Sequence, residues 1–161
     1  MPVGRYPGWP AVDPTTHTVY EANEEDATVS VIDGSRRTVT ATVPVGKSPH
    51  TVEVDPGTHT VYVTNWGDNA VSVIDGSTRA VTATVPVGRS PEGVAVDPGT
   101  HTVYVTNSKD NTVSVIDAST RTVTATVPAG KNPYGVAVDP GSHTVYVANS
   151  WDSTGSVSES R

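Results

Sequence analysis

The stretch of sequence that decides the fold is residues 93–127, which read GVAVDPGTHTVYVTNSKDNTVSVIDASTRTVTATV. It contains four short runs in which side chains alternate with a period of two, and each break between runs carries Pro, Gly, Asn or Asp. Such alternation predicts β-strands, and these four residue types favour turns. We therefore predict four strands, over 93–96, 102–106, 112–116 and 122–127. In the first turn we expect Gly99 to adopt a positive φ.

The same unit recurs every 42 residues along the chain. The tripeptide Val-Asp-Pro begins four times, at Val12, Val54, Val96 and Val138. Four tyrosines keep the same interval, Tyr20, Tyr62, Tyr104 and Tyr146. Tandem four-stranded units of this length are typical of propeller blades, whereas β-helix coils are shorter and a sandwich does not repeat internally. We therefore predict an all-β fold, a β-propeller of four-stranded antiparallel blades.

The composition supports this fold and excludes several classes of protein. The 161 residues include 30 Val and 24 Thr, which favour strands, and no Leu, Phe, Gln or Cys. The absence of Leu argues against a helical bundle, and the absence of Cys excludes disulfides, thiolate catalysis and Cys-ligated zinc. A net charge of −7 predicts no nucleic-acid partner, and no apolar run is long enough to predict a membrane span. We see no signal peptide, and these features predict no particular cellular compartment.

Alignment on the 42-residue interval divides the chain into about three and a half blades. We predict one partial propeller domain, 1–161, with blades at about 9–46, 51–88 and 93–130 and an incomplete blade at about 135–158. We expect the last unit to have a damaged third strand and no fourth strand, because Gly155 and Ser158 replace Val and Ile there. Open blade faces favour association. Three interpretations remain: a homodimer that completes a ring of about eight blades, a fragment of a larger propeller, and a closed four-bladed ring.

Two units carry the tetrapeptide Tyr-Val-Thr-Asn, at residues 62–65 and 104–107, and each is followed by Asp-Asn and Val-Ile-Asp. Val-Pro-Val-Gly occurs at residues 43–46 and 85–88. In these residues, and over almost its whole length, the chain resembles the YVTN β-propeller repeat family. The resemblance implies a WD40-like superfold, commonly of seven blades. It also implies an extracytoplasmic or cell-surface location, and a likeness to the propellers of lactonases and quinoprotein-type enzymes.

Side chains that differ between units are free of the demands of the scaffold, and they are our candidates for function. They concentrate in the loop before each first strand and the loop after each second strand, and strand alternation places both loops on one face. Four of the candidates are cations that would form a positive collar at the channel mouth, Arg5, Lys47, Arg89 and Lys131. His50 is the one histidine outside the repeat pattern. The remaining candidates are Trp9, Trp66, Glu92, Lys109, Tyr134 and Trp151.

The recurring histidines and aspartates are expected to serve turns. Metal ligands must converge to about 2 Å from one ion, whereas equivalent positions diverge around a ring. We therefore predict turn or surface roles for His17, His59, His101 and His143. The aspartates that end strands are typical of turns, and Asp68, Asp110 and Asp152 are expected to brace loops. We find no arrangement of nucleophile, base and orienting group, and we predict no catalytic residue, no metal and no cofactor.

The sequence thus predicts a non-enzymatic propeller module that binds a protein or small ligand through its variable loop face. One alternative is part of a propeller enzyme or cofactor-binding protein, lactonase-like or quinoprotein-like. Another is a truncated repeat fragment without independent activity.

Overall fold

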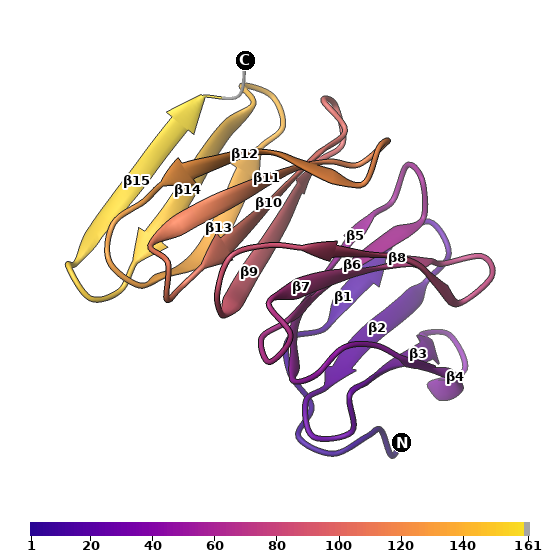
Figure 1. The fold of residues 1–161 in the computed structure, drawn as a ribbon. Helices are drawn as coiled ribbons and strands as arrows, with labels where there is room; N and C mark the ends of the chain where they lie inside the picture. Colours follow the sequence, from indigo (N-terminus) through magenta and orange to yellow (C-terminus); the bar gives the residue numbers. More distant parts are fainter. Residues whose placement is uncertain (160–161) are drawn as a thin grey trace.

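Residues 1–159 fold into 15 β-strands in four antiparallel sheets, which follow one another in chain order (Figure 1). Blade 1 consists of β1 (Ala11–Asp13), β2 (Thr18–Asn23), β3 (Thr28–Asp33) and β4 (Thr38–Pro44). Blade 2 consists of β5 (Pro49–Asp55), β6 (Thr60–Asn65), β7 (Ala70–Asp75) and β8 (Ala80–Pro86). Blade 3 consists of β9 (Pro91–Asp97), β10 (Thr102–Asn107), β11 (Thr112–Asp117) and β12 (Thr122–Pro128). Blade 4 consists of β13 (Pro133–Asp139), β14 (Thr144–Asn149) and β15 (Thr154–Glu159).

This computed structural model describes residues 1–159, so the last two residues of the predicted domain, 160 and 161, lie outside the described residues. In every sheet the strands pair in sequence order, and β1, β5, β9 and β13 contact one another in series on the inner side. The all-β prediction is confirmed, and the fold is a partial β-propeller. Within residues 1–159, no helix is long and apolar enough to cross a membrane.

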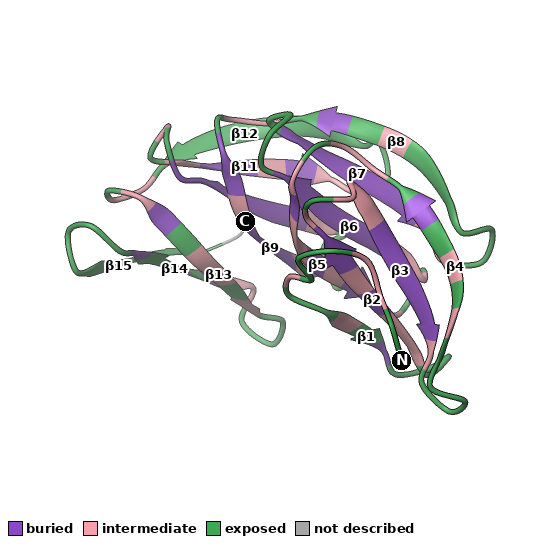
Figure 2. Ribbon diagram, turned by 90° about the horizontal axis from the view of Figure 1, so that it is seen from below, coloured by how far each residue is buried: buried purple, intermediate pink, exposed green. Residues whose placement is uncertain are grey.

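The hydrophobic core lies between the blades. We call the face of a blade that packs on the preceding blade its front face, and the opposite face its back face. The interface of blades 2 and 3 contains Tyr62, Val71, Val73 and Val85 on one side and Val94, Val103, Val105 and Ile116 on the other. Because a middle blade is covered on both faces, its central strands are buried throughout, while outer strands such as β12 stay exposed (Figure 2). Each such Val or Ile stabilises the fold by roughly 1.5–3 kcal/mol.

Two expectations for the turns and the last blade are wrong. No glycine among residues 1–159 has a positive φ; in the Asp-Pro-Gly turns the left-handed residue is the histidine two positions later, with φ of 54° at His59 and 53° at His101. The third strand of blade 4 is also intact, because β15 pairs with β14 from Asn149↔Thr154 to Thr144↔Glu159. Backbone pairing tolerates the Gly and Ser substitutions, and what blade 4 loses is packing.

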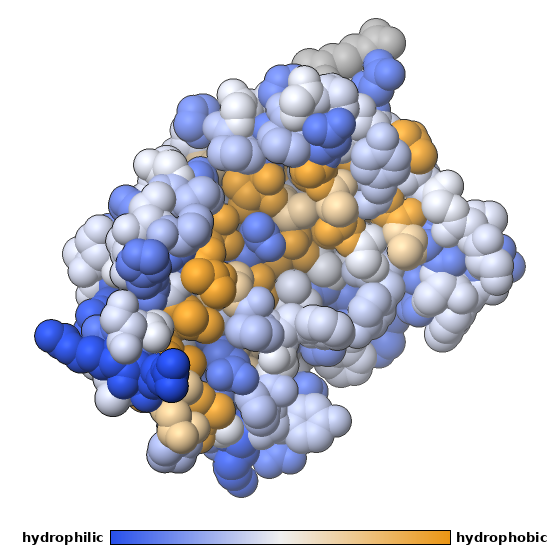
Figure 3. All heavy atoms as spheres, turned by 180° about the vertical axis from the view of Figure 1, so that it is seen from behind, coloured by the Kyte–Doolittle hydropathy of each residue, from blue (hydrophilic) through white to orange (hydrophobic). Residues whose placement is uncertain are grey.

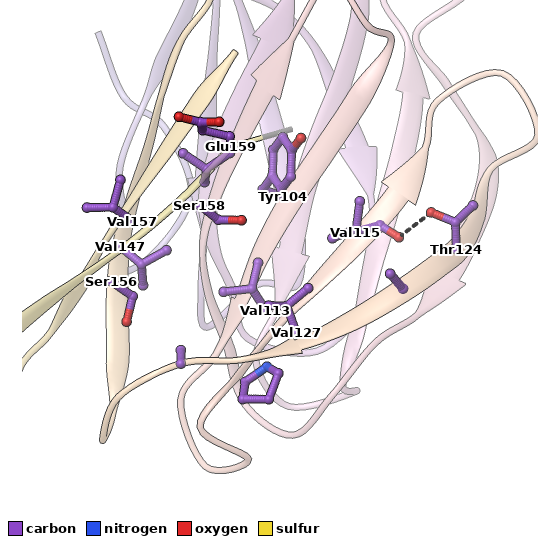
Figure 4. Close-up of a pocket in the computed structure, with 14 residues that line it drawn as sticks. Tyr104, Val113, Val115, Thr124, Val127, Val147, Ser156, Val157, Ser158 and Glu159 are labelled. Carbon is purple, nitrogen blue, oxygen red and sulfur yellow. Dashed lines mark hydrogen bonds between the residues drawn. The ribbon is translucent and has the colours of Figure 1, made fainter. Parts of the chain in front are cut away.

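A groove of about 430 Å³ lies between blades 3 and 4, where Ser158 replaces an isoleucine and the described part of blade 4 has three strands instead of four (Figure 4). Tyr104, Val113 and Val127 line one side, and Val147 and Ser158 line the other. The bare ends of the array also leave apolar side chains uncovered, and a band of hydrophobic residues crosses the face shown in Figure 3.

The aspartates have the predicted structural roles. Asp55 ends β5 and accepts a hydrogen bond from the backbone N–H of Gly57 at 2.9 Å, and Asp33 accepts from Ser35 N–H at 2.9 Å after β3. Two of the repeating histidines lie in turns and also join neighbouring blades. The Nδ1 atom of His59 lies 2.6 Å from Asp13 of blade 1, and that of His143 lies 2.8 Å from Asp97 of blade 3.

Candidate binding site on the loop face

The two variable loops of each blade lie side by side on one face of the propeller, which we call the loop face. In blade 2 the N–H of Trp66 donates to the carbonyl oxygen of Ser48 at 3.0 Å, and the N–H of Lys47 donates to Asp68 at 2.8 Å. The aspartate bond repeats in the other blades, at Asp26, Asp110 and Asp152. The loops are thus braced by residues that the repeats share, and the residues that differ are displayed on this brace.

A second set of shared contacts holds the first residues of the inner strands. The carbonyl oxygen of Glu92 accepts a hydrogen bond from the Thr64 hydroxyl at 2.9 Å, and that of Tyr134 accepts from the Thr106 hydroxyl at 2.8 Å. In both cases the donor belongs to the preceding blade. The backbone of these variable positions is therefore fixed, which leaves their side chains available for other contacts.

His50, Glu92 and Tyr134 occupy the same position in β5, β9 and β13, and their side chains meet across three blades. The His50 Nε2 atom lies 3.2 Å from a Glu92 carboxylate oxygen and 3.3 Å from the Tyr134 hydroxyl. The His50 and Tyr134 rings pack edge to face, with centroids 6.2 Å apart. Contacts across three blades in succession require the inner strands to converge, as they do around a propeller channel.

The loops that follow β6 and β10 add three side chains to this group. The indole N–H of Trp66 donates to Glu92 at 3.1 Å, and the Ser108 hydroxyl donates to the same oxygen at 3.4 Å. The Lys109 ammonium lies 4.7 Å from the centroid of the Trp66 ring, within the range of a cation–π interaction. We call His50, Trp66, Glu92, Lys109 and Tyr134 the loop-face cluster.

The loop-face cluster combines a fixed polar centre with exposed aromatic rings. The Glu92 side chain is only 14% exposed, accepts hydrogen bonds from Trp66 and Ser108, and lies 3.2 Å from His50, so its carboxylate is held in place. Trp66 and Tyr134 remain 38% and 42% exposed. Amphipathic rings on a rigid base are the side chains that most often anchor partners at interfaces. Within residues 1–159 no group of three or more His, Asp or Glu residues is arranged to hold a metal ion.

The predicted collar of four cations is partly neutralised. The Arg5 guanidinium contacts Asp26 at 2.7 Å, and the Arg89 guanidinium contacts Asp110 at 2.5 Å. The backbone N–H and the guanidinium of Arg89 together lower the pKa of Asp110. An exposed cation whose charge is balanced by a neighbouring carboxylate attracts an anionic ligand less strongly than a free one.

Six of the predicted residues lie outside the loop-face cluster. Arg5 and Arg89 form the ion pairs just described, and Lys47 and Lys131 are exposed beside their braced loops. Trp9 is 60% exposed, and its N–H donates to the carbonyl oxygen of His50 at 3.3 Å. Trp151 is 77% exposed at the end of the array. The structure therefore brings together five of the eleven candidates.

Sequence comparison between repeats passed over two residues, Ser108 and Glu53. Ser108 lies in a variable loop, but serine is common in loops and nothing in the pattern distinguished it. Glu53 stands in β5 where the other units have Ala11, Ala95 and Ala137. It faces blade 3 beside Tyr62, and burial raises its pKa to about 7. A charged residue in place of alanine in an inner strand is a sequence signal that could have identified Glu53.

No protein-family model and no curated protein matches this chain. Among solved structures, a chain of hydrazine synthase from Kuenenia stuttgartiensis matches with a TM-score of 0.86 and 24% sequence identity. The match covers 98% of this chain and 47% of that chain, so this chain spans about half its length. At this identity the likeness shows the fold alone, a propeller-type array of antiparallel sheets.

Proposed function

We propose that this chain is a non-enzymatic propeller module that binds a protein or small ligand through the loop-face cluster. The observation that carries the proposal is that the shared positions and the variable positions of the repeat have different roles. Residues shared by the repeats hold the loops and the starts of the inner strands, as Thr64 does for Glu92. Residues that differ between the repeats meet one another at a single place and leave two aromatic rings exposed.

The hydrogen bonding of the loop-face cluster supports binding more than catalysis. A general base needs a free acceptor directed at its substrate. Here one Glu92 oxygen accepts hydrogen bonds from Trp66 and Ser108, and His50 Nε2 lies 3.2 Å from the other oxygen and 3.3 Å from the Tyr134 hydroxyl. These polar groups hold one another in position, while Trp66 and Tyr134 offer the open surface.

We also infer kinship with the YVTN repeat family, and with it a location outside the cytoplasm or at the cell surface. The support lies in the residues 62–65 and 104–107, which carry the repeat's signature on β6 and β10. In both copies the final asparagine is buried and donates to the serine two positions into the next strand, Ser72 or Ser114. The signature thus builds the blade and leaves the loops free to vary.

A random peptide library displayed on phage, selected against the immobilised chain, tests this proposal. We expect the selected peptides to bind Trp66→Ala and Glu92→Ala at least about 30-fold more weakly than the original chain. Trp151→Ala is the matched control, because this tryptophan is also exposed on a loop but lies outside the loop-face cluster. Equal binding by Trp66→Ala, or a selection that yields no binder, would count against the loop-face cluster as the site.

A further inference from the structure

The back face of blade 4 repeats a surface that is covered in every other blade. Tyr146 is 48% exposed, whereas its counterparts Tyr20 and Tyr62 are each 2% exposed. Val157 is 64% exposed, whereas its counterpart Val73 is 1% exposed. A shallow groove of about 460 Å³ runs over this face and includes Ala137, Tyr146 and Val157. An apolar surface of this kind favours association with a complementary face.

The front face of blade 1 is the opposite half of the same kind of interface. Val12 is 55% exposed there, whereas its counterpart Val54 in blade 2 is 6% exposed against blade 1. Val19 on the same face is partly exposed, whereas its counterpart Val61 is completely buried. Each end of this chain therefore carries one half of the interface that occurs three times inside it.

The histidine–aspartate contacts between blades give this interface a polar marker. In two interfaces the turn histidine of one blade contacts the strand-ending aspartate of the preceding blade, His59 with Asp13 and His143 with Asp97. By the same register, Asp139 at the back of blade 4 would receive the histidine of a following blade. His17 at the front of blade 1 would meet the aspartate of a preceding blade. Both residues are exposed, so the ends are complementary in charge when His17 is protonated.

The two ends are also complementary in size. Glu21 stands on the front face of blade 1 where the other blades have Val63, Val105 and Val147. On the back face of blade 4, Gly155 stands where blades 2 and 3 have Val71 and Val113, and Ala148 replaces a threonine. Glutamate is longer than valine, so the Glu21 side chain of one end can extend toward the region of the other end in which Gly155 and Ala148 leave room.

We propose that two copies of this chain associate head to tail, with the back face of blade 4 of each copy on the front face of blade 1 of the other. A two-fold axis covers both exposed ends at once and leaves neither half of the interface bare. The pairing places His17 of one copy beside Asp139 of the other at both contacts. This inference goes beyond the proposed function and does not depend on it, because no residue of the loop-face cluster takes part.

Light scattering coupled to size-exclusion chromatography over a concentration series tests the proposal. We expect the mass of two chains at high concentration, and a dissociation constant raised about 30-fold or more by Tyr146→Arg. Val123→Arg is the matched control, because Val123 is a 36% exposed residue on the outer strand β12, away from both ends. A monomer at all concentrations, or a dimer indifferent to Tyr146→Arg, would overturn the proposal and leave this face to a different partner.

A charge exchange tests the head-to-tail arrangement itself. His17→Glu sets two carboxylates against each other at both contacts, and Asp139→Lys sets a lysine against His17, so each variant alone should be monomeric. Mixed together they should regain the dimer, since one contact then joins lysine to glutamate and the other joins His17 to Asp139. Circular dichroism first verifies the fold of Asp139→Lys, because Asp139 also accepts hydrogen bonds from Gly141 and Ser142 in its own turn. If the folded variants fail to associate on mixing while the original chain is a dimer, the head-to-tail arrangement is wrong.

Discussion

The interface between blades 2 and 3 and the interface between blades 3 and 4 share one plan but differ in how they close. In the first, Ile116 is 1% exposed and belongs to the same core cluster as Tyr62 and Val73. In the second, Ser158 takes the place of Ile116, and a groove of about 430 Å³ separates it from Tyr104. The outer part of the second interface is open where Ser158 replaces an isoleucine and where the described part of blade 4 has three strands instead of four.

The histidine–aspartate contact shows the opposite trend, because it occurs in the interface that is less well packed. In the open interface the Nδ1 atom of His143 hydrogen bonds to Asp97 at 2.8 Å. In the closed interface no ion pair joins His101 to Asp55, among the residues that the structure describes. An interface between blades can thus be densely packed without a histidine–aspartate contact, or less densely packed with one.

The strongest way to break this contrast is Ile116→Ser, which gives the closed interface the residue of the open one. We expect the free energy of unfolding to fall by about 3 kcal/mol, because a cavity forms and a hydroxyl is buried in apolar surroundings. Urea denaturation followed by circular dichroism measures the change. A loss below about 1 kcal/mol would show that this side chain does not close the interface.

Glu53 is a titratable group inside the closed interface, between blades 2 and 3. Its replacement should change the free energy of unfolding by an amount that depends on pH. Its pKa rises from 4.5 to about 7 because burial disfavours the charged form. The folded state then binds more protons than the unfolded state between these values, so the original chain loses stability as pH rises through this window. After allowance for its partial exposure, the loss amounts to about 2 kcal/mol.

Glu53→Gln keeps the shape of the protonated side chain and should escape this loss. Its advantage in unfolding free energy should be smallest below pH 4.5 and complete above about pH 7. Urea denaturation at a series of pH values gives both curves. Parallel curves for the two proteins would mean that Glu53 titrates in the folded chain as it does in the unfolded chain.

The histidine–aspartate contact of the open interface should matter less. His143→Ala should lower the free energy of unfolding by about 1 kcal/mol, since it removes a partly exposed contact with a buried carboxylate. Burial alone would raise the pKa of Asp97, but hydrogen bonds from His143 and Thr100 outweigh it, and the pKa is lowered. His101→Ala is the matched control at the same repeat position, because it also places alanine at a positive φ but removes no contact with an aspartate, so it should lose less. Equal losses in the two variants would remove the distinction between the interfaces.

The smallest expected effect is a gain. Ser158→Ile restores the residue of blades 1 to 3 and should fill part of the groove between blades 3 and 4. Cavity filling of this kind stabilises a protein by about 1 kcal/mol. A rise of the thermal unfolding midpoint measures it. An unchanged or lower midpoint would show that the groove is not simply missing an apolar side chain.

Much of the fold could be predicted from the sequence, because the period-two alternation and the 42-residue interval can both be read in it directly, the interval for example from Tyr62 to Tyr104. The histidine–aspartate pairs could not be predicted, since residues 46 positions apart meet only when one blade docks on the next. The intact β15 was missed because side-chain losses at Gly155 and Ser158 say little about backbone pairing.

The candidate site was predicted in part. Comparison between repeats pointed to the loops that carry the loop-face cluster, but it could not rank residues within them, because convergence on Glu92 depends on the direction of each side chain. Trp66 and Trp151 looked equivalent in the sequence, yet Trp66 donates to Glu92 and Trp151 is 77% exposed.

The chain's three tryptophans offer the most direct test of the central claim that the loop-face cluster binds the partner. Trp9, Trp66 and Trp151 each give one indole N–H signal in a nitrogen-15-labelled NMR spectrum, and assignment needs only three single substitutions. During titration with a peptide selected from the library, we predict that the Trp66 signal shifts while those of Trp9 and Trp151 stay in place. A shift of Trp9 or Trp151 with an unmoved Trp66 would contradict the account.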